Sequence, residues 1–172
     1  MCFLKEIKSP EDLIPKYVSE YPGIEVYKVI KLERKFLKKV YKTPFTFHKI
    51  KIGKEPYELS HILMGDFVKS TSITPEGCYT DDEPNAICYL WDGTFVKQKE
   101  PEIAANSYIT IEEGIHSYSN EYAALDVANS MGFLKGECVV LKAYIPTGAI
   151  YFENWEGEIV STRLKITNEQ VK

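Results

Sequence analysis

One stretch of the sequence has the apolar spacing of a helix, whereas the segments around it have the patterns of strands and turns. This contrast limits the fold classes that the chain can adopt. Four apolar residues recur three or four positions apart: Ala124, Val127, Ala128 and Met131. That spacing predicts an amphipathic helix over about 119–131, with Ser119 as its N-cap and Gly132 directly after its last turn. The strands do not alternate with further helices, so a doubly wound parallel sheet is not expected. We predict an α+β fold built on a curved, mostly antiparallel sheet.

A chain of 172 residues suits one domain. Four parts follow one another in it: an N-terminal helical segment (1–22), basic strands (24–54), a long loop region (55–86) and a strand–helix–strand core (87–172). Ser9 is the expected cap of the short N-terminal helix, and Pro22 ends that segment. The loop region is predicted to hold one short strand near 67–70. An Asp-Gly turn at 92–93 predicts a hairpin, and the last three strands are expected in meander order.

The net charge of −4 conceals an asymmetry between the two ends of the chain. Residues 1–54 carry 13 basic and 6 acidic side chains, whereas the remainder carries 8 and 19. Aromatic residues lie among the lysines, so Lys38, Lys39 and Lys42 are candidates for contacts with an anionic ligand or an acidic partner. The sequence pI near 5.5 makes a nucleic-acid partner the weaker prediction.

Several classes of protein are not expected from this sequence. It has no apolar run of the roughly 20 residues that a membrane helix needs, and its first residues do not resemble a signal peptide. We therefore expect no membrane partner and a cytoplasmic location. The four cysteines lack the spacing of a zinc site and the three histidines form no local pair, so no metal and no cofactor are predicted.

The stretch "GIHSYS" is the first candidate site. His116 follows a predicted strand at the mouth of the predicted helix, where an imidazole can donate a hydrogen bond or carry a proton. Ser117 and the first backbone N–H groups of the helix can hold an anion, and Tyr118 can stack on a ring. The alternative interpretation is an ordinary strand end and helix cap. In that case the same residues have only a structural role.

Glu158 is the second candidate, because it opens a predicted strand. A carboxylate there can accept a ribose hydroxyl or stabilise a developing positive charge. Base rates favour the other interpretation, a solvent-facing acid on a turn.

The second half of the chain resembles small proteins of unassigned function that are encoded by phages and prophages. The resemblance covers about sixty residues. The matching positions are Gly114, Ile115, His116 and Ser117; Ala123 or Ala124; Val140, Ala143, Ile145, Pro146 and Gly148; and Glu158, Ile159, Val160, Ser161, Leu164 and Ile166. It implies a phage or mobile-element origin, and a location in the host cytoplasm.

The same half is similar, more distantly, to ADP-ribosyltransferase-like folds. The residues that fit that pattern are Ser117, Tyr118, Ala124, Val139, Val140, Leu141 and Glu158. The resemblance implies NAD as the substrate, Glu158 as the catalytic carboxylate, and His116 or Tyr118 as ring contacts. Lys28 would contact a phosphate; it stands where that fold usually carries an arginine or a histidine.

Three functions follow as expectations. The first is an accessory protein that binds a nucleotide-like ligand or a host protein, with a role in counter-defence. The second is an enzyme that transfers ADP-ribose from NAD. The third is a protein-interaction module without catalytic activity.

Overall fold

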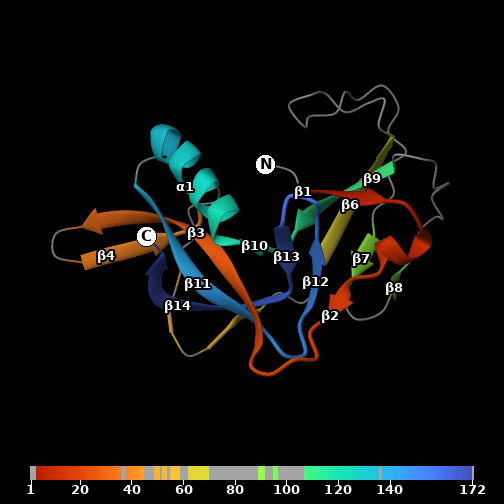
Figure 1. Ribbon diagram of the computed structural model, residues 1–172, viewed down its shortest axis with the longest axis horizontal. Helices are drawn as coiled ribbons and strands as arrows, with labels where there is room; N and C mark the ends of the chain where they lie inside the picture. Colours follow the sequence, from red (N-terminus) through yellow and green to blue (C-terminus); the bar gives the residue numbers. More distant parts are fainter. Residues whose placement is uncertain are drawn as a thin grey trace.

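The computed structural model describes residues 3–35, 38–44, 49–50, 52–53, 55–58, 62–69, 89–91, 95–96, 107–135 and 137–171. Within them the strands form two antiparallel sheets (Figure 1). The smaller has five strands, in the order β1 (Phe3–Ile7), β9 (Ser107–Glu113), β6 (Ile62–Lys69), β7 (Tyr89–Trp91) and β8 (Phe95–Val96). Together with one α-helix, this arrangement confirms the predicted α+β class and the mostly antiparallel pairing.

The larger sheet has nine strands and stays open, with β2 and β5 as its end strands. Its main path is β2 (Lys16–Tyr17), β12 (Ile150–Glu153), β13 (Glu158–Ser161), β10 (Ile115–Tyr118), β3 (Gly23–Lys35), β11 (Cys138–Pro146), β14 (Arg163–Val171) and β5 (Tyr57–Glu58). The ninth strand, β4 (Lys38–Lys42), pairs with β3 and forms a hairpin with it.

The α-helix, α1 (Glu121–Lys135), covers part of one face of the nine-stranded sheet (Figure 1). Its predicted apolar stripe packs there in the helix-side cluster, which contains Val29, Tyr118, Ala124, Ala128, Met131, Val140 and Val171. The helix begins two residues later than predicted and extends past Gly132, which lies inside it. Asn120 rather than Ser119 caps it, because the Asn120 side chain accepts a hydrogen bond from the N–H of Ala123 at 2.7 Å.

The five-stranded sheet packs on the same face at the other end. The inter-sheet cluster joins the two sheets and contains Phe3, Ile7, Ile62, Ile109, Ile111, Phe152 and Val160. The opposite face of the nine-stranded sheet holds the central cluster, which is built mainly from β3, β11 and β14. Figure 1 shows β10 and β13 between α1 on one side and the five-stranded sheet on the other.

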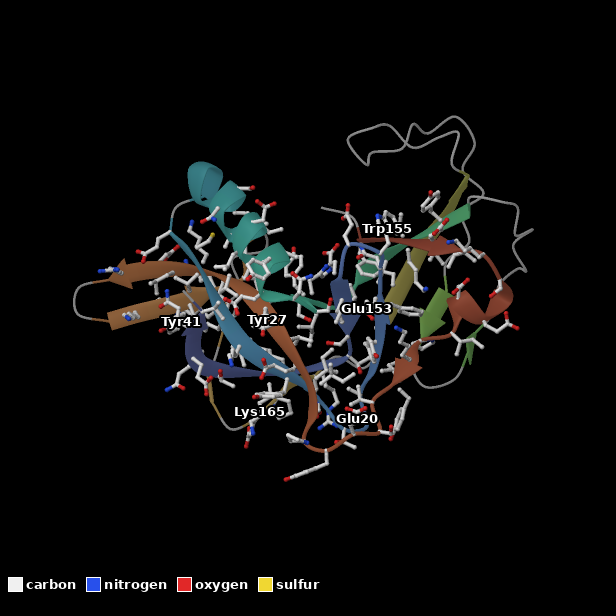
Figure 2. All side chains as sticks on the ribbon, viewed as in Figure 1. Glu20, Tyr27, Tyr41, Glu153, Trp155 and Lys165 are labelled. Atoms are coloured by element: carbon white, nitrogen blue, oxygen red, sulfur yellow. The ribbon has the colours of Figure 1, made fainter. Side chains whose placement is uncertain are left out.

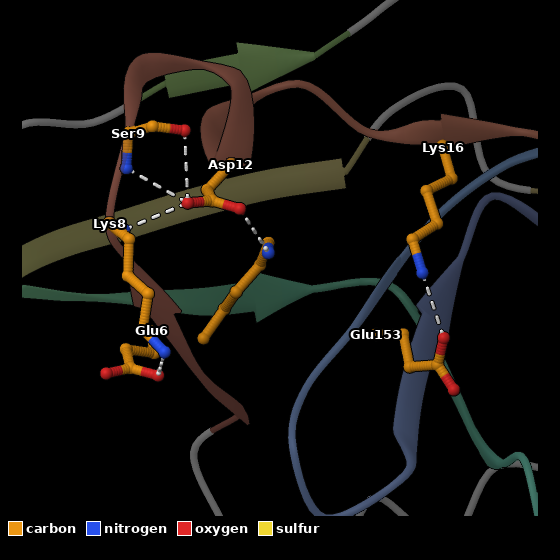
Figure 3. Close-up of polar contacts among 7 residues, drawn as sticks. Glu6, Lys8, Ser9, Asp12, Lys16 and Glu153 are labelled. Atoms are coloured by element: carbon orange, nitrogen blue, oxygen red, sulfur yellow. Dashed lines mark hydrogen bonds and ion pairs between the residues drawn. The ribbon is translucent and has the colours of Figure 1, made fainter.

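The N-terminal prediction needs correction. Only one short turn, η1 (Pro10–Leu13), is helical, and it is a 3-10 helix. The Asp12 carboxylate holds this turn, because it accepts hydrogen bonds from the backbone N–H groups of Lys8 at 2.9 Å and Ser9 at 3.0 Å (Figure 3). The residues on either side form β1 and β2 instead. Lys16 ties β2 to β12 through an ion pair with Glu153 at 3.0 Å (Figure 3).

Two further expectations differ from the structure. The region predicted as a long loop, 55–86, contains β5 and the eight-residue strand β6, which supplies the middle of the smaller sheet. The last strands are not a simple meander, because β11 pairs with β3 and β14 rather than with β12. Strands β7 and β8 pair as the predicted hairpin, although its 92–93 turn lies outside the described residues.

No helix in the described part of the chain has both the length and the apolar character needed to cross a bilayer.

Candidate functional site

Three strands bring together the site residues predicted from distant parts of the sequence. Tyr118 pairs with Glu158 on one side and with Tyr27 on the other, so β13, β10 and β3 lie side by side at this point. Because side chains alternate along a strand, residues in register share a face. The face that carries α1 therefore has the row Glu158, Tyr118, Tyr27 and Lys142.

His116 and Glu158 form the polar centre of this face. The Nδ1 of His116 lies 3.0 Å from the Oε1 of Glu158. The carboxylate is almost completely buried, with its side chain 8% exposed, whereas the histidine side chain is 32% exposed. A carboxylate on one ring nitrogen fixes the orientation of an imidazole and leaves the other nitrogen for a further partner. Nε2 of His116 is therefore the atom of this pair that can meet a ligand.

The turn before β13 positions the Glu158 carboxylate. The side-chain oxygen of Asn154 accepts hydrogen bonds from the N–H groups of Glu156 at 3.0 Å and Glu158 at 2.9 Å. Gly157 has a φ of +76°, which a glycine adopts without strain. A Cβ at this position would stand 2.6 Å from the Oγ of Ser119, which itself donates to the Gly157 carbonyl. Local turn chemistry thus sets where β13 begins.

Tyr118 is not free to stack on a ligand, because its ring is 9% exposed and belongs to the helix-side cluster. Burial, and after it the carboxylates of Glu158 and Glu156, raises the pKa of the Tyr118 phenol well above its usual value. The phenol therefore stays neutral at physiological pH.

Lys28 lies on the other face of the sheet, within the strand next to β10. It is 8% exposed, and its ammonium donates a hydrogen bond to the carbonyl oxygen of His116. Burial lowers the pKa of Lys28 to about 8, while the Glu158 carboxylate acts in the opposite direction. Lys28 thus supports the backbone beneath His116 from the core side, where a ligand phosphate does not reach it.

The first candidate site, the stretch "GIHSYS", does not lie at the start of the helix as its sequence indicates. His116 lies within β10 and not at the start of α1, and Ser117 is fully buried. Asn120 already caps the first turn of the helix. Ser117 consequently lies away from both the helix N-terminus and the exposed edge of His116.

The basic residues of β4 lie apart from this centre. Figure 1 shows the β3–β4 hairpin extending beyond α1, away from β10 and β13. Lys42 makes an ion pair with Glu33 at 2.8 Å, and Lys39 is exposed. The Lys38 side chain lies outside the described residues. A ligand at His116 would therefore be recognised without these three lysines.

Two tyrosines, one acid and one lysine on β3 and β11 continue the row on the same face of the sheet. We call Glu25, Tyr27, Lys142 and Tyr144 the tyrosine strip; Figure 2 labels Tyr27 on β3. The hydroxyls of Tyr27 and Tyr144 both donate to the Glu25 carboxylate, at 3.1 and 3.2 Å. Lys142 lies 3.8 Å from Glu25. All four side chains are partly or fully exposed, and the strip joins the row of the site at Tyr27, which pairs with Tyr118.

Sequence reasoning did not select the tyrosine strip or Glu156. A signal for the strip was present in the sequence, because Glu25, Tyr27 and Val29 alternate along β3 and so share one face of the sheet. The alternation does not tell whether another element covers that face. The signal for Glu156 was its spacing, since it precedes Glu158 by two residues across Gly157. Both acids act electrostatically on the Tyr118 hydroxyl.

Among the described residues, no group of three or more His, Cys, Asp and Glu side chains gathers as a metal site would require. Comparison with known proteins found no matching family model, no similar curated protein and no similar solved structure.

Proposed function

We propose that this chain is a binding protein whose ligand site is centred on His116 and the adjoining tyrosine strip. The observation that carries the proposal is the hydrogen bond between His116 and the buried Glu158. Holding a carboxylate at 8% exposure costs free energy unless it is paired. Here it is paired with an imidazole that remains one-third exposed, an arrangement suited to presenting a fixed Nε2 to a ligand.

A nucleotide-like molecule is the ligand class that these groups suit best. Carboxylates and a fixed imidazole nitrogen hydrogen-bond well to ribose hydroxyls, as Glu25 and His116 can do. Partly exposed phenol rings such as Tyr27 and Tyr144 offer faces on which a base can pack. The many acids near this face favour a ligand that directs its ribose and base, and not its phosphates, toward the strip.

The test is a thermal-shift screen of the purified chain with NAD, ADP-ribose, cyclic di- and trinucleotides and short RNA. A ligand at a hundredfold its Kd adds about 2.7 kcal/mol to the free energy of unfolding. We expect at least one nucleotide to raise the Tm, and His116→Ala to abolish the shift.

The matched control replaces Lys38, Lys39 and Lys42 with serine. Because these residues lie on the distant β3–β4 hairpin, the triple variant should keep the shift. A shift that this variant loses and His116→Ala keeps would move the binding site to the hairpin. No shift with any compound would overturn the ligand proposal and favour a host protein as the partner, or an interaction module without a small ligand.

An NAD-dependent transfer of ADP-ribose is the second candidate, and the positions of Glu156 and Glu158 favour it. Glu158 opens β13 and Glu156 lies in the turn two residues before it, and both carboxylates act on the same phenol. As an enzyme, the chain should hydrolyse or transfer from NAD, and Glu158→Gln should remove that turnover while the protein stays folded. Turnover that survives Glu158→Gln would exclude Glu158 as the catalytic carboxylate.

A phage or mobile-element origin, and a counter-defence role such as sequestering a signalling nucleotide, belong to the same proposal. They rest on the sequence resemblance of the second half of the chain. A cyclic nucleotide as the only compound that raises the Tm would support sequestration, whereas NAD or ADP-ribose would support the transferase candidate.

A further inference from the structure

Strands β3 and β10 part next to His116. They are joined by one backbone pairing, Tyr118 with Tyr27, although both strands continue beyond it. Lys28 follows Tyr27 on β3, and its side chain donates a hydrogen bond to the carbonyl oxygen of His116 on β10. A lysine ammonium thus bridges the two strands at the point where their direct pairing stops.

The core face of the sheet carries a buried polar pair at this point. Ser117 of β10 is paired with Ile159, and Lys28 of β3 is paired with Leu141. Each lies one position beyond the Tyr118–Tyr27 pairing, so both point to the core face of the sheet. Ser117 is 0% exposed and Lys28 is 8% exposed. Ile159 and Leu141, both in the central cluster, close the row at its two ends. Lys28 and Ser117 therefore lie on the same face of neighbouring strands, in a row whose two end members are apolar.

This pair has more hydrogen-bond donors than acceptors. An ammonium has three N–H donors, and one of those on Lys28 is used by the His116 carbonyl. The Oγ of Ser117 has no hydrogen-bond partner among the described residues. The Glu158 carboxylate lies on the opposite face and is engaged by His116. A buried charge and a buried hydroxyl with unused hydrogen-bonding capacity destabilise the folded state unless a further group bonds to them.

We propose that Lys28 and Ser117 bind a small monovalent anion, of the size of chloride, between β3 and β10. An anion accepts hydrogen bonds from the ammonium and from the hydroxyl, and it neutralises the buried positive charge. A large anion is excluded by the burial of the row and by Ile159 and Leu141 at its ends.

The anion would hold His116 in place, because the same ammonium binds the His116 carbonyl. Burial lowers the pKa of Lys28 to about 8, so the lysine is charged and the site formed at pH 7, and both are lost in alkaline solution. Lys28 is paired with Leu141 on one side, and the charged group that acts on it is the Glu158 carboxylate across the sheet.

A chloride titration at pH 7 tests this proposal. Sodium chloride replaces sodium gluconate at constant ionic strength, so that general screening is unchanged and only the small anion varies. We expect the Tm to rise by about 3 °C once chloride exceeds its Kd roughly tenfold. The rise should be absent in Ser117→Ala and in Lys28→Met, and present in the control variant Lys39→Ser. No rise in the unmodified protein, or an equal rise in Ser117→Ala, would overturn the proposal.

Diffraction gives a second test that does not depend on whether Lys28→Met folds. Crystals of the unmodified protein are soaked in sodium bromide, and data are collected at the bromine absorption edge. An anomalous peak within hydrogen-bonding distance of both Lys28 Nζ and Ser117 Oγ supports the site. An ordered water at that position without anomalous signal, or a peak that Ser117→Ala retains, would show that the pair is not an anion site.

Discussion

At the scale of single residues, the properties of the His116 centre come from unequal burial of paired groups. Glu158 is buried and His116 is partly exposed, so the carboxylate depends on the imidazole more than the imidazole depends on the carboxylate. His116→Ala should lower the free energy of unfolding by about 1–3 kcal/mol, because it leaves a buried carboxylate without a partner. Urea denaturation of both single variants and the double variant with Glu158→Gln measures the coupling. Strictly additive losses would show that the hydrogen bond contributes nothing to stability.

Lys28 gives a prediction about pH at the same scale. Its pKa is about 8 in the folded protein against the ordinary lysine value of 10.5, so the unfolded chain binds more protons between these two pH values. The free energy of unfolding should therefore rise with pH in this window, by about 2 kcal/mol between pH 7 and pH 9.5.

Urea denaturation in chloride-free buffer at the two pH values measures that difference. Lys28→Met should remove most of it, because methionine has no charge to lose. A pH dependence that is the same in both proteins would show that Lys28 titrates normally. Measurements stay below pH 10, where tyrosines begin to ionise.

At the scale of elements, Gly114 makes the connection between the sheets possible. The chain leaves the five-stranded sheet at the end of β9 and enters the nine-stranded sheet at β10, with Gly114 as the only residue between them. A Cβ on Gly114 would overlap the Cγ1 of Val160, which is fully buried. Gly114→Ala should cost about 1–3 kcal/mol through overpacking.

Val160→Ala removes the overlapping methyl group, so the double variant should be more stable than the sum of the two single losses predicts. Gly53→Ala is the matched control, because a Cβ there has no neighbour within 4 Å; its effect should stay within about 0.5 kcal/mol. Thermal or urea unfolding measures all four proteins. Equal losses from Gly114→Ala and Gly53→Ala would mean that the close approach at β10 does not constrain the fold.

At the scale of the whole molecule, the inter-sheet cluster decides whether the two sheets unfold together. It contains Phe3 from β1 and Val160 from β13, so each sheet contributes to one buried layer. Phe3→Ala should lower the free energy of unfolding by about 3–5 kcal/mol. It should do so in one transition, seen alike by tryptophan fluorescence and circular dichroism. Tyr21→Ser is the control, since Tyr21 is 93% exposed. Two separate transitions in the unmodified protein would show that the sheets are independent.

Local signals in the sequence were enough for the fold class and for the position of most elements. The helical spacing of Ala124 and Ala128 located α1, and strand patterns in the last third of the chain located β11 and β12. The stretch predicted as one last strand forms two, β13 and β14, which pair with different neighbours. Errors arose where local signals compete. Ser9 and Pro10 indicate a helix start, but only one 3-10 turn forms there because β1 and β2 on either side are drawn into sheets. Gly132 matches a helix end, yet α1 continues past it over the sheet.

Local patterns along the chain are enough to predict an α+β fold with one central helix, and they single out His116, Glu158 and Lys28. Their positions relative to one another come from the tertiary structure. His116 and Glu158 lie on one face of adjacent strands, and Lys28 lies on the other face beneath them. The physical reason is range. Periodicity and turn chemistry act over a few residues, whereas the order of strands in a sheet is decided by packing among segments more than a hundred residues apart. The burial of Lys28, and with it the lowered pKa of its ammonium, follows from the order of the strands and not from the residues next to it in the sequence.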